Sequence, residues 1–465
     1  MTMKADRPYP QARITEKGAR ALRAGHPWVY EGEVTALEPG RAAPAGADVA
    51  TGAAAAGKHA GALGSPDAAA DSPVANGSLV DVLDPKGRYL GTGLLSLKSR
   101  IRVRLVTRNA NDGFGSAFWE RKVRWAWEAR KTVMGGEPDL SACRVIFSEA
   151  DEFPGLIVDR FGDVLVAEVL SVGMERHKDE VFSALVRVLA QDGVRLRGVY
   201  ERNDVAVRAL EGLPQEKGWW RPVGAVGLAA SGAAPTPLDL PAEPSPTQTQ
   251  IVENGVRYHV DFENGQKTGF FLDQKYNRRA VARIARGRRV LDCCTHTGSF
   301  ALNAALGGAE FVRAVDVSAQ AIEMARANAR LNGPDVEARM DFTVANVFDL
   351  LPQIEEGRNP ERFDLIVLDP PAFTKSRKTL RSAERGYREI NYRAMRILPR
   401  GGYLVTCSCS HFMDPERFRR MLAEAAHDAG VTLRQVEERQ QAPDHPIVWG
   451  VPETDYLKCL IFQVV

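Results

Sequence analysis

Strand-like and helix-like hydrophobic patterns alternate over the C-terminal half of the chain. Strand-like runs occur at 289–292, 311–316, 363–369 and 402–409, and Ala-rich or amphipathic stretches separate them. This alternation predicts a doubly wound parallel sheet, because parallel neighbours need a helical crossover between them. Such a sheet binds its ligands at the carboxyl ends of its strands. We therefore expect an α/β domain over residues 251–465.

The N-terminal half has a pattern with more strands and fewer helices. Strand-like alternation around 79–83 and 101–106, with a turn at Asp84-Pro-Lys-Gly between two strands, predicts a small β domain over residues 1–110. A short helix is expected from Thr15 in the same domain.

A second small domain is expected over residues 115–222. Its amphipathic helix at 117–133 carries Trp119, Val123, Trp127 and Val133 near helical spacing, which favours core positions over an RNA-stacking platform. Short strands and a helix at about 175–191 complete a predicted α+β domain.

Two stretches lack any pattern that would bury apolar surface. Residues 41–77 are roughly two-fifths Ala without an aromatic residue, and residues 223–250 are rich in Ala, Pro, Gly and Thr. Segments of this composition do not bury enough surface to offset their conformational entropy. We interpret 41–77 as a disordered insertion in a surface loop and 223–250 as a flexible linker or loop.

Composition and charge exclude several classes of protein. The 465 residues, 44% of them hydrophobic, suffice for two or three domains. A net charge of +2 is far from that of a nucleic-acid coat protein, so RNA binding needs local basic patches. The six cysteines form neither zinc-type pairs nor a disulfide framework, and no run has the length of a membrane span. We expect a cytoplasmic protein with reduced thiols, no metal and no membrane partner.

The segment from Val290 to Asp316 has the strongest chemical pattern. Asp292 ends one predicted strand, Gly298 lies in the loop after it, and an Ala-rich helix leads to a strand that ends at Asp316. Glycine lets a backbone approach a ligand, and an acid at the second strand end is typical of ribose binding. The loop lacks Gly-x-Gly-x-x-Gly, so a dinucleotide is not the first choice. The segment resembles motifs I and II of class I S-adenosylmethionine (SAM) methyltransferases; without a ligand it would be an ordinary α/β unit.

Two further segments follow strands at the same predicted sheet edge. Asp369-Pro-Pro-Ala-Phe comes after a buried strand, and its prolines stiffen a loop in which Asp369 can bond the polar edge of a base. In the next strand, Cys407 and Cys409 point the same way. A buried Cys is usually a small hydrophobic residue, but a thiolate at this edge can attack C6 of a pyrimidine and so activate C5 for methylation.

Several segments together resemble those of the bacterial large-subunit (23S) rRNA cytosine-C5 methyltransferases. They are Gly265-Gln-Lys-Thr-Gly-Phe-Phe-Leu-Asp-Gln, Asp369-Pro-Pro-Ala-Phe, Arg385-Gly-Tyr-Arg-Glu-Ile-Asn, Ser408-Cys-Ser-His-Phe-Met, Asp444-His-Pro and Tyr456-Leu-Lys. His26-Pro-Trp-Val-Tyr is similar to the RNA-binding PUA domain of that family. The resemblance implies a Rossmann-like SAM methyltransferase domain, preceded by a PUA-like β-barrel and a small α+β domain. It also implies that Cys409 is the nucleophile and Cys407 an additional thiol.

The sequence departs from the family pattern in the cofactor loop. His296 and Ser299 stand where an aromatic residue and a second Gly are usual, and Asn346 stands where an acid is common. A related branch has a further Cys after its Asp-Pro-Pro-like motif, a region that Ala372 and Phe373 occupy in this chain. A water held by Asp369 would then remove the C5 proton.

The predicted site combines two groups of residues. We expect Cys409 and Asp369 to be catalytic. We expect the cofactor SAM to be bound by Lys267, Thr268, Phe270, Arg278, Asp292, Thr295, His296, Thr297, Gly298, Phe300, Asp316, Val317, Asn346, Val347, Phe348 and Asp369. Near Cys409 in the sequence, Lys375 and His411 are candidates to lower the pKa of its thiol.

The expected partner is large-subunit rRNA, and the chain is expected to be a monomer or a homodimer. Basic residues between Lys375 and Arg388 follow the Asp-Pro-Pro loop, which favours RNA contact over a merely solvated face. Two alternatives stay open: a guanine or exocyclic-amine N-methyltransferase that uses Asp369-Pro-Pro, and a non-catalytic RNA-binding or ribosome-assembly factor.

Overall fold

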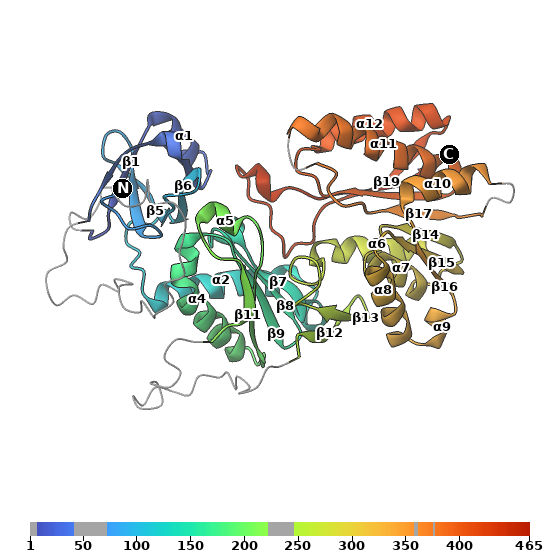
Figure 1. Ribbon diagram of the computed structural model, residues 1–465, viewed down its shortest axis with the longest axis horizontal. Coiled ribbons are helices and arrows are strands. Elements are labelled where there is room, and N and C mark those ends of the chain that lie inside the picture. The colour runs from blue at the N-terminus through green and yellow to red at the C-terminus, as the bar shows by residue number, and fades with distance from the viewer. Residues whose placement is uncertain (1–6, 41–71, 222–245, 358–360, 375–376) are drawn as a thin grey trace. The chain divides into compact units, whose positions relative to one another are not determined.

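The computed structural model describes residues 7–40, 72–221, 246–357, 361–374 and 377–465. The chain divides into two compact units (Figure 1). The first unit comprises residues 1–249, 261–270 and 447–451, and the second comprises residues 250–260, 271–446 and 452–465. Within the described ranges, no helix has the length and hydrophobicity of a transmembrane segment.

The N-terminal part of the first unit is a six-stranded sheet with the order β2-β6-β5-β4-β1-β3. The helix α1 starts where the hydroxyl of Thr15 accepts a hydrogen bond from the amide of Gly18 at 3.2 Å. The predicted small β domain and its short helix are thus confirmed. The elements are β1 (Gln11–Ile14), α1 (Glu16–Arg23), β2 (Trp28–Tyr30), β3 (Val34–Glu38), β4 (Leu79–Leu83), β5 (Tyr89–Leu95) and β6 (Ile101–Thr107).

The predicted insertion at 41–77 is wrong at its C-terminal end. Val74 is only 3% exposed and packs into the core of the six-stranded sheet. The side chain of Asn76 accepts a hydrogen bond from the amide of Leu97 at 2.8 Å, and the amide of Gly77 donates to the carbonyl of Leu95. One buried valine and these bonds therefore order residues 72–77 despite their polar composition. Residues 41–71 lie outside the described residues.

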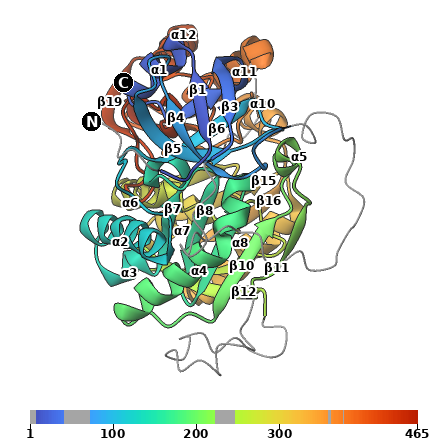
Figure 2. The same ribbon diagram turned by 90° about the vertical axis from the view of Figure 1, so that its left-hand side faces the viewer.

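The central part of the first unit is a five-stranded sheet with the order β11-β10-β9-β8-β7, and α2 and α4 pack against it (Figure 2). Trp119 and Trp127 are buried, which confirms their predicted core positions. Val133 is exposed instead, because the helix ends at this residue. The elements are α2 (Ser116–Val133), α3 (Glu137–Leu140), β7 (Ala142–Phe147), β8 (Leu156–Phe161), β9 (Val164–Val169), α4 (Val172–Gln191), β10 (Gly198–Asn203), α5 (Arg208–Glu211) and β11 (Glu216–Trp219).

The predicted linker at 223–250 extends too far. Strand β12 (Gln248–Glu253) already begins within it and pairs with β13 (Val256–Asp261) in a two-stranded sheet. Only Ile251 and Glu253 of β12 are buried, so the strand lacks an apolar stripe that the sequence could reveal. Residues 223–245 lie outside the described residues.

The second unit contains a seven-stranded sheet with the order β16-β15-β14-β17-β18-β20-β19. The first five of these strands are parallel, which confirms the predicted doubly wound sheet, and β20 runs antiparallel between β18 and β19. The strand β19 was not predicted, because most of its residues are exposed and polar. The strands are β14 (Arg289–Cys293), β15 (Phe311–Asp316), β16 (Met340–Val344), β17 (Leu365–Leu368), β18 (Tyr403–Ser408), β19 (Leu433–Arg439) and β20 (Lys458–Val464).

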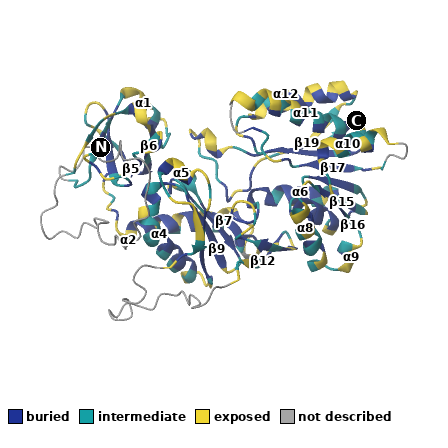
Figure 3. Ribbon diagram, in the orientation of Figure 1, coloured by how far each residue is buried: buried dark blue, intermediate teal, exposed yellow. Residues whose placement is uncertain are grey.

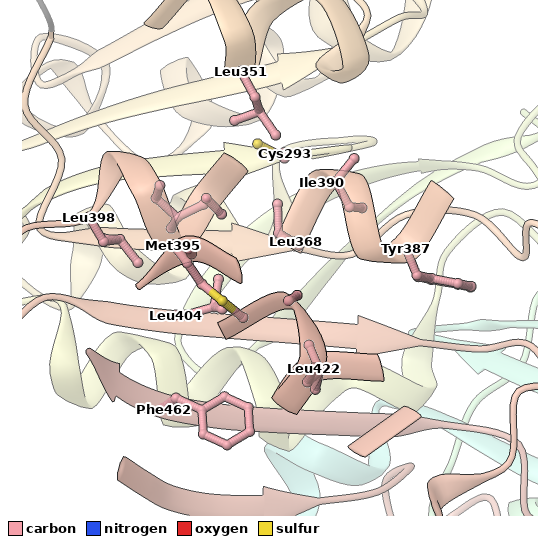
Figure 4. Packing of buried hydrophobic residues seen from close by; sticks show 14 of the residues in the cluster. Cys293, Leu351, Leu368, Tyr387, Ile390, Met395, Leu398, Leu404, Leu422 and Phe462 are labelled. Carbon is pink, nitrogen blue, oxygen red and sulfur yellow. The ribbon is translucent and has the colours of Figure 1, made fainter. Parts of the chain in front are cut away.

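Helices cover both faces of this sheet, which buries its central strands β14, β17 and β18 almost completely (Figures 1 and 3). One face carries α6 (Lys275–Ile284), α7 (Ser299–Leu306) and α8 (Ala319–Leu331), with the short α9 (Pro334–Glu337) beside α8. The other face carries α10 (Val347–Glu356), α11 (Leu380–Ile397) and α12 (Pro415–Ala429). Figure 4 shows the core beneath this second group, with Met395 of α11 beside Leu404 of β18. This core holds the strand ends in fixed positions.

Candidate active site

Four predicted site residues lie at the carboxyl ends of neighbouring strands. Asp292 lies near the end of β14, Asp316 ends β15, Asp369 directly follows β17, and Cys409 directly follows β18. Because these strands are adjacent and parallel, the sheet brings the four residues to one edge. This edge is the place where open α/β sheets bind their ligands.

The carboxylate of Asp316 is oriented by two backbone amides. Its Oδ2 accepts a hydrogen bond from the amide of His296 and its Oδ1 accepts one from the amide of Ser318, both at 2.9 Å. An ionised carboxylate has about four acceptor positions, so two amides leave capacity for hydroxyl donors of a ligand. The two amides thus fix the orientation of this carboxylate at the strand end.

Asp292 is a buried acid with one unmatched acceptor. Its Oδ2 accepts hydrogen bonds from the hydroxyl of Thr295 at 2.5 Å and from the amide of Ala301 at 2.8 Å. Its Oδ1 is buried and has no hydrogen-bond donor among the described residues. Burial raises the pKa of Asp292 to about 7. An oxygen of this kind fits a ligand that brings an N–H donor or a positive charge.

The loop after β14 makes a tight turn through the left-handed region. Cys294, His296 and Gly298 have φ values of 62°, 52° and 83°. A Cβ at Gly298 would come within 3.0 Å of the Cβ of Ala325 in α8. Its φ and its contact with α8 favour glycine at this position, and the expectation that the backbone approaches a ligand here stays a prediction. Burial lowers the pKa of His296 to about 4, so its ring is neutral.

Asp369 is held by a residue from a distant segment. The side-chain amide of Gln274 donates to Oδ1 of Asp369 at 2.8 Å, and Asn277 in turn donates to Oε1 of Gln274 at 2.6 Å. Behind Asp369, the ring of Phe373 packs 4.6 Å from that of Tyr387 and 5.8 Å from that of Phe348. Phe348 is 38% exposed, so the aromatic group reaches the surface, where a flat ligand can stack.

The two cysteines of the β18 segment have different surroundings. Cys407 is completely buried within β18 opposite Cys459, and both its contact with that thiol and its burial raise its pKa well above the usual value. Cys409 lies beyond the end of the strand and is partly exposed. The next residue, Ser410, shares a hydrogen bond of 3.0 Å with the hydroxyl of Tyr387. Only Cys409 of this pair therefore faces the sheet edge.

Three predicted cofactor residues belong to the first compact unit, and a fourth, Arg278, lies in α6 of the second unit. Lys267, Thr268 and Phe270 belong to the first compact unit, where the hydroxyl of Thr268 donates to Asp159 at 2.6 Å. Arg278 is buried and forms an ion pair with Glu253 at 2.7 Å. Arg278 also lies over the ring of Phe300 in α7, 5.9 Å from its centroid, and its charge acts on His296. The cofactor roles of Thr268 and Arg278 stay predictions.

The remaining predicted residues lie on the loops around the edge. Asn346 accepts a hydrogen bond from the amide of Phe348 at 3.1 Å and thereby caps α10. Val317 is 74% exposed just after Asp316, whereas Phe300 and Val347 are buried. Thr297 is also buried, with no hydrogen-bond partner for its hydroxyl among the described residues.

Sequence reasoning missed three residues of the site: Gln274, Tyr387 and Lys458. Each lies within a segment that carried the family resemblance, so the signal was present, but only the folded chain shows their contacts. The ammonium of Lys458 donates to the carbonyl of Ser410 at 2.8 Å, next to Cys409. By contrast, Lys375 lies outside the described residues.

Comparison with known proteins agrees with this geometry. The S-adenosylmethionine-dependent methyltransferase family matches residues 237–463, and a PUA-like domain matches residues 59–108. The chain is therefore a SAM-dependent methyltransferase with a PUA-like domain. It is 34% identical to the ribosomal RNA large subunit methyltransferase I of Klebsiella pneumoniae (strain 342) over 97% of each chain. It is 40% identical to that of Pseudoalteromonas translucida over 83% of this chain and 91% of the other. The chain belongs to the ribosomal RNA large subunit methyltransferase I family.

Solved structures share this fold. A protein from Streptococcus mutans assigned as a SAM-dependent methyltransferase matches with a TM-score of 0.71 and 18% identity over 98% of this chain and 100% of the other. A methyltransferase solved in complex with S-adenosylhomocysteine matches with a TM-score of 0.73 and 18% identity, with the same coverage. At this identity the likeness concerns the fold.

Proposed function

We propose that this chain methylates C5 of a cytosine in large-subunit rRNA, with Cys409 as a covalent nucleophile. The observation that carries the proposal is the position of Cys409 beside Asp369, each directly after one of two neighbouring strands. Cys407 and Cys459, by contrast, are sealed in the core. The names of the relatives, ribosomal RNA large subunit methyltransferases, support the substrate class.

In this proposal the ends of β14 and β15 bind SAM. The carboxylate of Asp316, held by two amides, accepts hydrogen bonds from the ribose hydroxyls. The unmatched Oδ1 of Asp292 faces the positively charged methionine part of the cofactor. Phe348 and the cap residue Asn346 lie at the end of β16, where the adenine belongs. The carboxylates also favour a cation at this edge, which suits the sulfonium.

The ends of β17 and β18 carry the chemistry on the base. SAM supplies a methyl group on a sulfonium. The thiolate of Cys409 adds to C6, an S–C6 bond forms, and the electron pair of the C5–C6 double bond makes C5 nucleophilic. C5 takes the methyl group, and the electron pair of the broken S–CH3 bond stays on the donor sulfur. A water held by Asp369 removes the C5 proton; the double bond then re-forms and the S–C6 bond breaks.

A basic surface on α11 gives the RNA backbone a place to bind. Arg381 and Arg385, four residues apart within α11, lie on one side of this helix and are exposed, and the exposed Lys378 lies just before the helix begins. Arg388 is already paired with Asp428. Exposed cations beside the site neutralise phosphates and position a strand without reading its sequence.

The proposal is tested with an RNA substrate that carries 5-fluorocytosine at the target. Fluorine does not leave C5 as a proton does, so the enzyme should remain covalently attached to the RNA in the presence of SAM. Cys409→Ala should form no adduct and transfer no methyl group, whereas Cys407→Ala is the matched control and should retain most activity. The adduct is detected by denaturing gel electrophoresis. Normal methylation by Cys409→Ala would refute the covalent mechanism.

A second candidate is methylation of an exocyclic amine, without a covalent step. The observation in its favour is the carboxylate of Asp369, which Gln274 orients in a loop stiffened by two prolines. Nucleoside analysis of the methylated RNA distinguishes the two functions. An amine methyltransferase would place the methyl group on nitrogen, and its activity would not depend on Cys409.

A further inference from the structure

Lys458 lies beside the proposed nucleophile although it is far from it in the sequence. It is the first residue of β20, and antiparallel pairing places it opposite Ser408, the residue before Cys409. Its ammonium donates to the carbonyl of Ser410 and to that of Tyr456, both at 2.8 Å. The side chain of Lys458, 7% exposed, therefore reaches along the segment that holds Cys409.

The charges of Lys458 and Cys409 act on each other. Burial lowers the pKa of Lys458 to about 8, and a negative charge on Cys409, together with Asp455 and Asp414, raises it. The ammonium form thus still dominates at pH 7. Electrostatic coupling is reciprocal, so an ammonium that a thiolate stabilises also stabilises that thiolate. Lys458 further lines a cavity of about 430 Å³, through which its protons can exchange with solvent.

We propose that Lys458 is a positioning residue that keeps Cys409 in its reactive thiolate form. The inference rests on the proposed function only in that Cys409 is the nucleophile. The positive charge lowers the energy of the thiolate, and the bond to Ser410 fixes the backbone on the far side of Cys409. The thiol proton leaves to solvent, and no further reactant is needed.

The phenol of Tyr387 does not replace this charge. Tyr387 of α11 interacts with Cys409, but burial raises the pKa of its phenol, so it stays neutral at the pH of the reaction. On the side of Lys458, Asp414 and Asp455 support the ammonium form. Lys458 therefore provides a positive charge for this thiol.

The experiment separates charge from hydrogen bonding with two substitutions. Lys458→Gln can still donate to the two carbonyls but has no charge, whereas Lys458→Arg keeps the charge. The rate at which iodoacetamide alkylates Cys409 is measured in the full-length protein without RNA between pH 5.5 and 9.5, by mass spectrometry of the Cys409 peptide. In Lys458→Gln we expect the midpoint of the curve of alkylation rate against pH to rise by about one pH unit or more. The alkylation rate at pH 6.5 should then fall about tenfold. Lys458→Arg should stay within about threefold of the wild type.

Each outcome decides the proposal. An unchanged midpoint in Lys458→Gln overturns it, even where methylation falls, because the role of Lys458 would then be structural. A similar rise in Lys458→Gln and Lys458→Arg also overturns it, because charge would not be the cause. Circular dichroism checks the fold, and Lys458→Met serves as the neutral variant where Lys458→Gln does not fold. The alkylation result does not depend on methylation. A shifted midpoint with an active Cys409→Ala variant would refute the proposed function and the catalytic role of the thiolate, and only the electrostatic coupling between Lys458 and Cys409 would remain.

Discussion

The two halves of the sheet edge surround their cysteines in opposite ways. Residues 292–298 and 316–318, which we propose bind the methyl donor, are called the donor half. In this half Cys294 lies near acidic side chains. Burial first, and then the charges of Asp316, Asp369 and Asp292, raise the pKa of Cys294 far above its usual value. The acceptor half, residues 369–373, 408–410 and 458, places Cys409 beside the ammonium of Lys458.

In the proposed function, this one edge meets two opposite chemical requirements. A cationic methyl donor is stabilised by carboxylates, and a nucleophilic thiol is stabilised by a cation. The reactivity of a cysteine in this molecule thus depends on its neighbours, and the following predictions test this separation.

The largest effect is expected from the two cysteines themselves. Cys409→Ala should reduce methyl transfer to rRNA by about a thousandfold or more, because no other group then activates C5. Cys294→Ala should retain kcat within about threefold, because a thiol among acids stays protonated. Methyl incorporation from labelled SAM measures both variants. A dead Cys294→Ala with an active Cys409→Ala would reverse the assignment of the two halves.

The next effect concerns the donor half alone. Asp316→Ala should weaken SAM binding about tenfold or more, since a charge-assisted hydrogen bond contributes about 1.5–3 kcal/mol. Asp341→Ala is the matched control. Asp341 lies near the amino end of the neighbouring strand β16, away from the proposed site, and pairs with Arg313. Calorimetric titration with SAM measures both. Equal affinities for the wild type and Asp316→Ala would remove Asp316 from the cofactor site.

A smaller effect is expected on the pH dependence of stability. Burial raises the pKa of Asp292 from 3.8 to about 7 in the folded chain, so the folded state binds this proton more tightly than the unfolded state. The resulting stabilisation is present at low pH and is lost as the pH rises through the folded pKa. Asp292→Asn should therefore lose less stability between pH 5 and pH 8 than the wild type, by about 1 kcal/mol or more. Urea unfolding without SAM measures the difference, and identical pH profiles would contradict it.

The smallest effect is expected from a change outside both halves. Deleting residues 41–71 and joining the flanks with a Gly-Ser linker should leave SAM affinity unchanged and shift stability by less than about 1 kcal/mol, because loop length costs little. Residues 72–77 are kept, since Val74 is part of a core. Thermal unfolding and calorimetry test this deletion. A large loss of stability would show that residues 41–71 take part in packing.

Much of the architecture could be read from local patterns. The alternation of strands and helices predicted the parallel sheet, and the spacing of Trp119 and Trp127 predicted a buried helix face. Such features depend on residues a few positions apart. The strands β12 and β19 and residues 72–77 were missed, because their polar residues are ordered by pairing and by one or two buried side chains rather than by an apolar stripe.

The sequence by itself determined which residues end the strands of the sheet, and hence that Asp292, Asp316, Asp369 and Cys409 would meet at one edge. The tertiary structure alone decided what surrounds them. Gln274 is 95 residues from Asp369, and Lys458 is 48 residues from Ser410. No local pattern encodes such contacts, since they arise only when α6 packs on the sheet and β20 pairs antiparallel with β18. Electrostatic coupling acts through space over a few ångströms, so the charge beside each cysteine is a property of the folded chain.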